Sequence, residues 1–359
     1  MRRELCISMR LSPISLGVIS IRSGKWLLSL FYGVLFLVGA PQSSSSRKVI
    51  YLDTRERVAA SLTFEWVSDK VVTPSLEFVQ RQNEIKRRQI ERLNIPPDQV
   101  KFIDESIANQ PFFLSDYYII KRTSQRTLVR CLIQMLSFPE ARVVQHQTDT
   151  YFLGDTIAEV AYGSEGDIMS VNLSKVVEKD VWGVGTPMGS VSAASLIFFA
   201  GISPLRLAGG AIDRWRLRSV TPETWVFVLA QQEGEEYQPE IEIHLDRRYQ
   251  DAPARLEIRY PDGEIQMWRT LKYKRIEGVW FPSEVEYSTN SAYNVRSRYT
   301  LVRTERTKSV ELEIPEGARI FDRRRLGDAA WDNLMDFEES VWKPGLLGGK
   351  ESKGTENKK

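Results

Sequence analysis

Few residues of this sequence have the chemistry of a catalytic site. Its two histidines, His146 and His244, are far apart in the chain. His146 stands between two glutamines, so the H-E-x-x-H spacing of a zinc protease is absent. The Gly-Ile-Ser-Pro-Leu segment at 201–205 lacks the final glycine of a nucleophile elbow and has proline where the helix must begin. We therefore predict no catalytic residues, no metal site and no cofactor.

The sequence has two cysteines, Cys6 and Cys131. Cys6 lies in the N-terminal leader described below, so Cys131 is left without a partner for an internal disulfide. Cys131 stands in the apolar run 128–133, which favours a small buried hydrophobic residue over a reactive thiol. We expect the hydrophobic core, and not disulfides, to hold the fold together.

Charged clusters supply the remaining candidates for chemistry. Glu233, Glu235 and Glu236 beside a glycine are interpreted as a solvated turn, although paired carboxylates can also hydrolyse a glycosidic bond. The basic runs 86–88 and 323–325 are balanced by nearby acids and have no stacking aromatics between them. We therefore expect no nucleic-acid partner, and a carboxylate-dependent hydrolase remains an alternative.

Aromatic residues in strand-like segments are the most distinctive feature of the sequence. A curved sheet needs large side chains on its concave face, and those that no helix covers leave an apolar pocket. Core packing accounts for most of these residues, and a ligand groove requires only the remainder. The candidate ligand-binding residues are Phe64, Trp66, Phe198, Phe199, Trp215, Trp225, Phe227, Trp268 and Trp280.

The elements that must position these residues are short strands separated by turn signals. Ile241, Ile243 and Leu245 alternate with charged or polar residues, which predicts a half-buried strand, and Leu62, Phe64 and Trp66 repeat the pattern. Further runs of this kind extend over 112–173 and 211–302. Consecutive strands joined by tight turns pair antiparallel. The predicted fold class is mainly β: a large curved antiparallel sheet, an unclosed half-barrel, with a few packed helices.

Three segments predict helices. The charged segment 76–93 follows a Thr-Pro start and stops before Pro96-Pro97, with a thin apolar stripe typical of a surface helix. The segment 191–200 is apolar on all sides, which favours either a core helix packed on the sheet or a hydrophobic lid over a cavity. The amphipathic pattern of residues 327–342 predicts a C-terminal helix. The Lys/Gly/Glu-rich tail 343–359 is expected to be disordered.

The N-terminal forty residues have the layout of an export signal. Scattered basic residues precede the apolar run 26–38 and the small residues Gly39 and Ala40. This run is shorter than the ~20 residues that a bilayer-spanning helix requires. We expect residues 1–40 to be a signal peptide or a retained N-terminal anchor, and 41–50 to be a Ser-rich linker. The leader also accounts for the formal net charge of +2, so the remainder has no basic excess.

The second half of the chain resembles exported bacterial proteins related to the periplasmic outer-membrane lipoprotein carriers, the LolA-like superfamily. The resemblance covers about a third of the chain: Ala254–Ile258, Pro261-Asp262-Gly263, Tyr273, Glu277–Pro282 (EGVWFP) and Ile314–Asp322 (IPEGARIFD). It implies one domain at 51–326, an unclosed antiparallel half-barrel wrapped over helices, with a hydrophobic cavity that holds acyl chains in the carrier members. This chain is longer than a minimal carrier.

These observations together predict an exported, non-catalytic binding module of the periplasm or cell envelope. It would hold an apolar or lipid-like ligand, such as a lipoprotein acyl group, in the concave face of the half-barrel. An alternative is a structural or sensory module of the envelope that binds a protein partner through an edge strand or an apolar patch.

Overall fold

The chain divides into two units, Met1–Lys48 and Val49–Lys359, and all described residues belong to the second. The computed structural model describes residues 54–94, 96, 100–154, 156–163, 166–175, 191–203, 215–229, 239–324 and 338–342. The predicted leader (1–40), linker (41–50) and tail (343–359) lie outside these residues. No helix in the described ranges is long and apolar enough to cross a bilayer.

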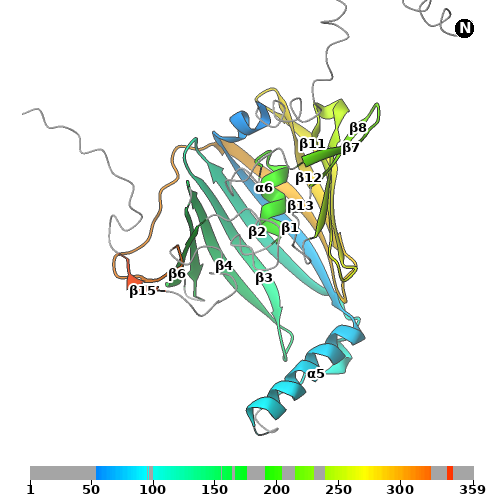
Figure 1. Ribbon diagram of the computed structural model, residues 1–359, viewed down its shortest axis with the longest axis vertical. Coiled ribbons are helices and arrows are strands. Elements are labelled where there is room, and N and C mark those ends of the chain that lie inside the picture. Colours follow the sequence, from blue (N-terminus) through cyan, green and yellow to red (C-terminus); the bar gives the residue numbers. More distant parts are fainter. Residues whose placement is uncertain are drawn as a thin grey trace, which may run out of the picture. The chain divides into compact units, whose positions relative to one another are not determined.

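One sheet of fifteen strands forms the framework (Figure 1). The strand order is β15-β14-β6-β5-β4-β3-β2-β1-β13-β12-β11-β10-β9-β8-β7, and every neighbouring pair is antiparallel except the parallel pair β6 and β14. The strands are β1 (Leu62–Pro74), β2 (Phe112–Arg122), β3 (Thr127–Ser137), β4 (Arg142–Leu153), β5 (Thr156–Tyr162), β6 (Ile168–Lys175), β7 (Trp215–Val220), β8 (Thr224–Leu229), β9 (Glu240–Asp246), β10 (Ala252–Arg259), β11 (Ile265–Ile276), β12 (Val279–Thr289), β13 (Tyr293–Arg306), β14 (Arg319–Asp322) and β15 (Glu338–Val341).

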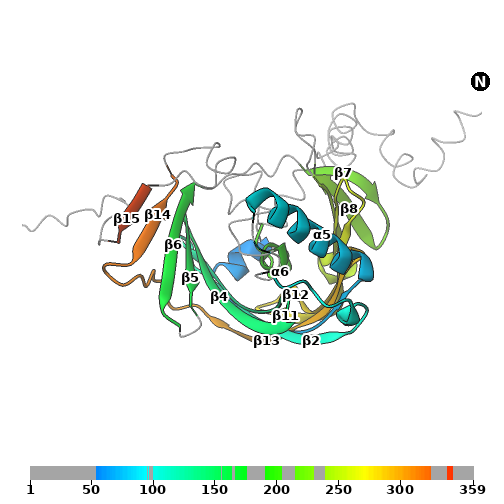
Figure 2. The same cartoon turned by 90° about the horizontal axis from the view of Figure 1, so that it is seen from below.

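The sheet curves into an open trough and does not close on itself (Figure 2). Register shifts interrupt several ladders, including those at Glu65/Trp66 in β1, Pro253/Arg255 in β10 and Thr270/Lys272 in β11. A β-bulge adds an unpaired residue to one strand, which bends that strand and increases its twist. The predicted fold class, a large curved antiparallel half-barrel with few helices, is confirmed.

The strand patterns read from the sequence place the core on the inner face, the side of the trough on which α6 lies. In β1, Phe64 and Trp66 are fully buried, while Val67, the residue after Trp66, is exposed. In β9, Ile241, Ile243 and Leu245 are buried in the same cluster. Because side chains alternate between the two faces of a strand, one face of the sheet collects the apolar residues.

Two α-helices have different surroundings. Helix α5 (Leu76–Leu93) begins at Ser75, whose hydroxyl accepts a hydrogen bond from the Phe78 amide, and ends at Asn94 in the left-handed conformation. It lies beyond one end of β1 and β2 and is mostly exposed, as predicted (Figure 1). Helix α6 (Val191–Phe199) lies inside the trough (Figure 2). Short 3-10 helices, η2 (Glu105–Ile107) and η5 (Arg247–Tyr249), and a helical segment at 54–59 complete the described helices.

A second apolar cluster lies on the outer face, opposite α6. It joins Leu128, Tyr151 and Val160 of β3–β5 to Val310 and Ile314 of the segment that leads into β14. This segment therefore covers part of the outer face of the sheet.

The structure corrects the prediction of a helix at 327–342 at its C-terminal side. Residues Glu338–Val341 form β15, which pairs antiparallel with β14, and residues 327–337 lie outside the described ranges. Trp342, directly after β15, is buried in the outer cluster with Ile320. Pairing with β14 and burial of Trp342 are long-range effects that helical periodicity in the sequence does not register.

Candidate functional site

The inner face of the sheet carries an apolar row across six strands, β8 to β13. The register places Phe227 opposite Ile243, Ile243 opposite Leu256, and Leu256 opposite Trp268. Trp268 lies opposite Tyr287 of β12. Val285, the neighbouring residue of β12 on the same face, lies opposite Tyr299 of β13. Directly opposed residues share a face, so these side chains form one continuous surface.

Helix α6 covers this surface. The helix has no polar face, and its side chains are buried: Leu196, Ile197, Phe198 and Phe199 are at most 4% exposed. The Phe199 ring lies 6.2 Å from that of Trp268, and Phe198 packs edge-on against Phe199 at 5.4 Å between ring centroids. Burial of each such side chain contributes ~1.5–3 kcal/mol, which holds the apolar helix inside the trough. Of the two roles that the sequence left open, the structure shows a core helix packed on the sheet.

Seven of the nine predicted ligand-binding residues belong to one buried cluster on the inner face and α6. They are Phe64, Trp66, Phe198, Phe199, Trp215, Phe227 and Trp268. Trp225 is partly buried and packs against this cluster, with its ring 6.5 Å from that of Phe227.

The ninth predicted residue, Trp280, lies apart from the others. Its neighbour Phe281 is fully buried in the inner cluster, so the alternation along β12 turns Trp280 to the outer face. There its ring contacts Tyr249 edge-on, with centroids 5.3 Å apart. Trp280 therefore does not join the other eight residues.

Two tryptophans of the inner face leave polar atoms without partners. Trp66 and Trp268 are fully buried, and neither indole Nε1 has a hydrogen-bond partner in the structure; the buried Ser297 hydroxyl is also unpaired. Buried polar groups without partners are rare in native proteins, and each costs ~1–3 kcal/mol. The described part of the inner face is thus apolar but retains unused hydrogen-bonding capacity.

Aromatic contacts connect these tryptophans to tyrosines of neighbouring strands. The Trp268 ring lies 4.5 Å from Tyr287 and 5.1 Å from Tyr299, and Tyr299 lies 5.9 Å from Tyr118. Burial raises the pKa of Tyr287 well above its ordinary value, so its hydroxyl stays protonated. The floor of the inner face is therefore uncharged in this region.

A buried ion pair interrupts the apolar surface toward the α5 end. Lys70 Nζ lies 2.7 Å and 2.9 Å from the two carboxylate oxygens of Asp116 and donates a further bond of 2.7 Å to the Gln134 carbonyl. The two charged side chains are only 10% and 2% exposed. The sequence alone does not reveal this pair, because it depends on the β1–β2 register: Ser68 lies opposite Asp116, and Lys70 is the next residue of β1 on the same face.

Arg55 closes the opposite end of the inner face. Its guanidinium is fully buried and donates hydrogen bonds to the carbonyls of Trp280, Asp251 and Gln250 at 3.1–3.3 Å. It also lies over the Phe281 ring, 5.8 Å from the centroid. These contacts tie the helical segment 54–59 to β12 and to the β9–β10 connection.

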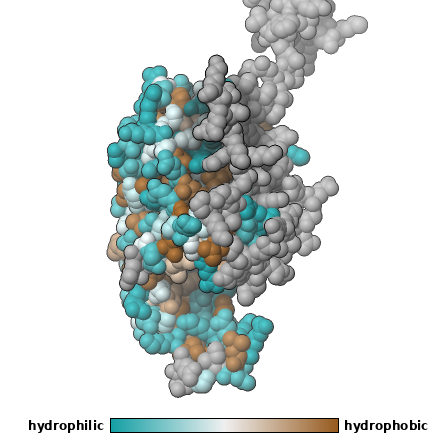
Figure 3. All heavy atoms as spheres, turned by 90° about the vertical axis from the view of Figure 1, so that its left-hand side faces the viewer, coloured by the Kyte–Doolittle hydropathy of each residue, from teal (hydrophilic) through white to brown (hydrophobic). Residues whose placement is uncertain are grey.

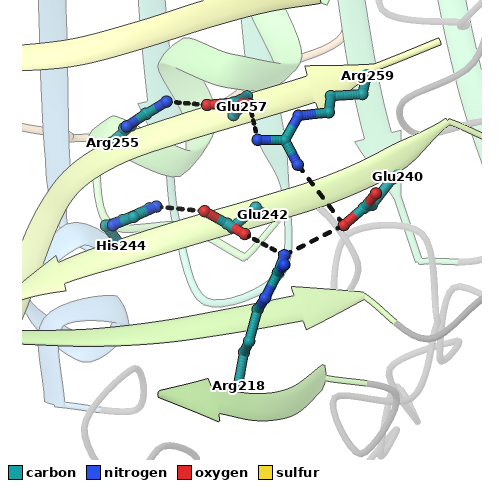
Figure 4. Close-up of polar contacts among 7 residues, drawn as sticks. All are labelled: Arg218, Glu240, Glu242, His244, Arg255, Glu257 and Arg259. Atoms are coloured by element: carbon teal, nitrogen blue, oxygen red, sulfur yellow. Dashed lines mark hydrogen bonds and ion pairs between the residues drawn. The ribbon is translucent and has the colours of Figure 1, made fainter. Parts of the chain in front are cut away.

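Carboxylates of the outer face are held by cations. Glu242 and Glu257 are cross-strand partners (Figure 4). Glu257 pairs with Arg255 and Arg259 of its own strand, and Glu242 pairs with His244 of its own strand and with Arg218 of β7. Burial acts to raise the pKa of Glu242, but the hydrogen bond from His244 and the charges of nearby arginines hold this pKa below its ordinary value. A general acid needs the opposite shift, so Glu242 does not fit the hydrolase alternative. Glu233, Glu235 and Glu236 lie outside the described residues.

Candidates for thiol or metal chemistry are few in the structure. Cys131 is fully buried, and burial raises its pKa well above the ordinary value of a thiol, which confirms the prediction of a buried hydrophobic residue. Within the described ranges, no group of three His, Cys, Asp or Glu side chains could hold a metal ion.

Comparison with known proteins gives similar structures only. No family model and no curated protein matches the sequence. A putative outer membrane lipoprotein-sorting protein domain from Vibrio parahaemolyticus is similar over 73% of this chain and 92% of its own, with 8% identity and a TM-score of 0.38. A DUF1329 family protein from Desulfovibrio piger is similar over 75% of this chain and 96% of its own, with 7% identity and a TM-score of 0.36. A LolA superfamily protein from Nitrosomonas europaea is similar over 72% of this chain and 94% of its own, with 9% identity and a TM-score of 0.35.

Two of these three structures carry the LolA or lipoprotein-sorting name. Similarity at this level does not bear on the ligand of this chain.

Proposed function

We propose that this chain is an exported, non-catalytic binding module of the periplasm or cell envelope. It holds an apolar or lipid-like ligand, such as the acyl part of a lipid or lipoprotein, against the inner face of the sheet. The ligand carries a hydrogen-bond acceptor, such as an ester or amide carbonyl, near its acyl chain.

The observation that carries this proposal is the pair of unpartnered indole N–H groups of Trp66 and Trp268. Both are fully buried within an aromatic surface, where water would have few other polar partners. An ester carbonyl would accept a bond from an indole, while its acyl chain would contribute ~0.8 kcal/mol for each buried CH₂ group. A hydrocarbon without an acceptor would leave both donors unsatisfied.

Binding requires α6 to change its packing. The helix occupies the inner face in this structure, with Phe199 on Trp268. Because the helix is apolar on all sides, an acyl chain can replace its side chains on the sheet without exposing a polar surface. In this proposal α6 covers the inner face when the module is empty and packs on the ligand when it is full.

The proposal is tested by competition between two ligands of equal chain length, a fatty acid methyl ester and an alkane. Each competes against a fluorescent fatty-acyl probe for binding to the full chain. Trp66→Phe and Trp268→Phe each remove one donor and retain the aromatic ring. We expect each substitution to weaken ester binding about 2- to 10-fold and to leave alkane binding nearly unchanged.

Trp342→Phe is the matched control, because Trp342 is buried in the separate outer cluster. It should leave binding of both ligands unchanged. Absence of probe binding to the wild-type chain, or equal losses for ester and alkane, would contradict the proposal. The alternative is a module that binds a protein partner. On the face in Figure 3, the exposed apolar residues of the described part are scattered among hydrophilic ones.

A further inference from the structure

We infer that the outer face of the sheet carries a second binding site, specific for a phosphate-bearing ligand, in a hollow over β9, β10 and β11. The hollow has a volume of about 630 Å³. Its lining includes five basic residues, His244, Arg248, Arg255, Arg269 and Lys272, and a single carboxylate, Asp246. This site lies opposite the face proposed to hold the acyl ligand and is independent of that function.

The strand register places basic side chains together on the floor of the hollow. His244 is the direct cross-strand partner of Arg255, and Arg255 is the direct partner of Arg269. Basic residues opposite one another on neighbouring strands repel and destabilise a sheet unless an anion compensates them. Figure 4 shows His244 of β9 and Arg255 of β10 side by side.

The carboxylates that balance these cations lie outside the hollow. Arg269 pairs with Glu286 at 2.9 Å, His244 Nε2 lies 2.6 Å from Glu242, and neither acid lines the hollow. The one lining acid, Asp246, is bound by Arg248 at 2.8 Å. These ion pairs stabilise the protein without a ligand. Within the hollow itself, hydrogen-bond donors of basic side chains outnumber carboxylates.

Local backbone geometry opens the hollow at this place. Register shifts at Pro253/Arg255 in β10 and between Thr270 and Tyr273 in β11 occur in adjacent strands. Bulges of this kind re-aim side chains and occur frequently beside binding sites. One wall is stiffened by Tyr249 and Tyr273, whose rings stack with centroids 4.1 Å apart.

The donor chemistry favours phosphate over a simple carboxylate. The planar guanidinium groups of Arg255 and Arg269 carry paired N–H donors that match the oxygens of a phosphate, and Lys272 adds a point charge. Each of the three also pairs with a carboxylate outside the hollow, Glu257, Glu286 and Glu284 respectively, so a phosphate would share these donors with the acids. Arg255 Nε is buried and has no hydrogen-bond partner in the structure. A phosphate offers more acceptor oxygens than a carboxylate, so it can satisfy several of these donors together.

The test measures binding of inorganic phosphate to the full chain by calorimetry at low salt. The key variant is Arg269→Gln/Lys272→Gln, since both side chains are more than 60% exposed and their loss leaves the core intact. The matched control is Arg303→Gln/Arg306→Gln, which removes two arginines of β13 away from the hollow that are 60% and 81% exposed. We expect the first variant to bind phosphate at least tenfold more weakly and the control to bind like the wild type.

A second arm distinguishes a free phosphate compound from a lipid headgroup. The same proteins are sedimented with phosphatidylcholine vesicles, with and without phosphatidylglycerol. Binding that requires phosphatidylglycerol and is lost in Arg269→Gln/Lys272→Gln assigns the site to a lipid headgroup; binding of soluble phosphate alone assigns it to a solute. Failure of the wild type to bind either, or equal binding by the two double variants, would overturn the inference.

Discussion

Phe199 of α6 lies on Trp268 of β11, with ring centroids 6.2 Å apart, and this contact joins the helix to the centre of the inner face. Both side chains are fully buried. Phe199→Ala should therefore lower the free energy of unfolding by about 3–5 kcal/mol, because it removes the contact and leaves a cavity. Urea denaturation gives this value, and Met169→Ala, at a side chain that is 63% exposed, should change it by less than about 0.5 kcal/mol. A small loss for Phe199→Ala would show that α6 is not part of the folded core.

Gly201 ends α6 in a conformation that a side chain would disturb. Its φ is +79°, and its amide and that of Ile202 bond back to the carbonyls of Phe198 and Ile197. A Cβ atom here would lie 2.4 Å from Arg55 Cγ and 2.9 Å from Phe281 Cε1. Gly201→Ala should thus cost about 3 kcal/mol or more of stability, from backbone strain and overpacking together.

Gly263 provides the control for this substitution. Its φ is +90°, but a Cβ atom there would meet nothing within 4 Å. Gly263→Ala should therefore cost only the backbone strain, about 1 kcal/mol. Equal losses in thermal unfolding of the two variants would refute the close packing of Arg55 against the end of α6.

The Lys70–Asp116 pair should behave as a buried ion pair. Asp116→Ala is expected to cost about 3–5 kcal/mol, because it leaves the Lys70 ammonium buried without its partner. The double variant Lys70→Met/Asp116→Leu should lose clearly less stability than the sum of the losses of Lys70→Met and Asp116→Leu made singly. A double-mutant cycle measures this difference, and the exposed Arg269–Glu286 pair should give a coupling of only 0–1 kcal/mol in the same experiment. Additive losses at Lys70 and Asp116 would argue against a coupled pair.

Glu159 should make stability depend on pH. It lies on the inner face of β5, opposite Thr150 of β4 and Asn172 of β6, and burial raises its pKa to about 7, although the charge of Arg323 acts in the opposite direction. A folded-state pKa above the unfolded value favours the protonated native state. The cost of burying the charge is therefore absent below about pH 4.5 and complete above about pH 7.

Replacing Glu159 by glutamine should remove this dependence. Because the side chain is only half-buried, we expect Glu159→Gln to stabilise the protein by about 1–2 kcal/mol at pH 8 and to have little effect at pH 4. Chemical denaturation at the two pH values provides the measurement, with Glu286→Gln, at an exposed carboxylate, as the control. Stabilisation that is equal at both pH values would contradict the raised pKa.

Alternation in the sequence was sufficient to predict the strands and the face that they bury. The predicted helix 76–93 matches α5, and the predicted strand with Ile241, Ile243 and Leu245 is β9. These features depend on neighbours within a few residues of one another, which a periodic pattern records.

Features that depend on register were beyond the sequence. The strand at 338–341 and the Lys70–Asp116 pair both follow from which residues lie opposite one another on different strands. The basic hollow shows the same limit, because His244, Arg255 and Arg269 come together only through three strands and their bulges. No local pattern in the sequence marks a bulge or the partner of a strand.

Native mass spectrometry of the full chain, purified without detergent, tests the acyl-binding role most directly. We expect a population heavier than the polypeptide by the mass of an acyl-containing lipid, which organic extraction removes, and smaller occupancy in Trp66→Phe/Trp268→Phe than in Trp342→Phe. A single polypeptide mass, identical before and after extraction, would contradict the account.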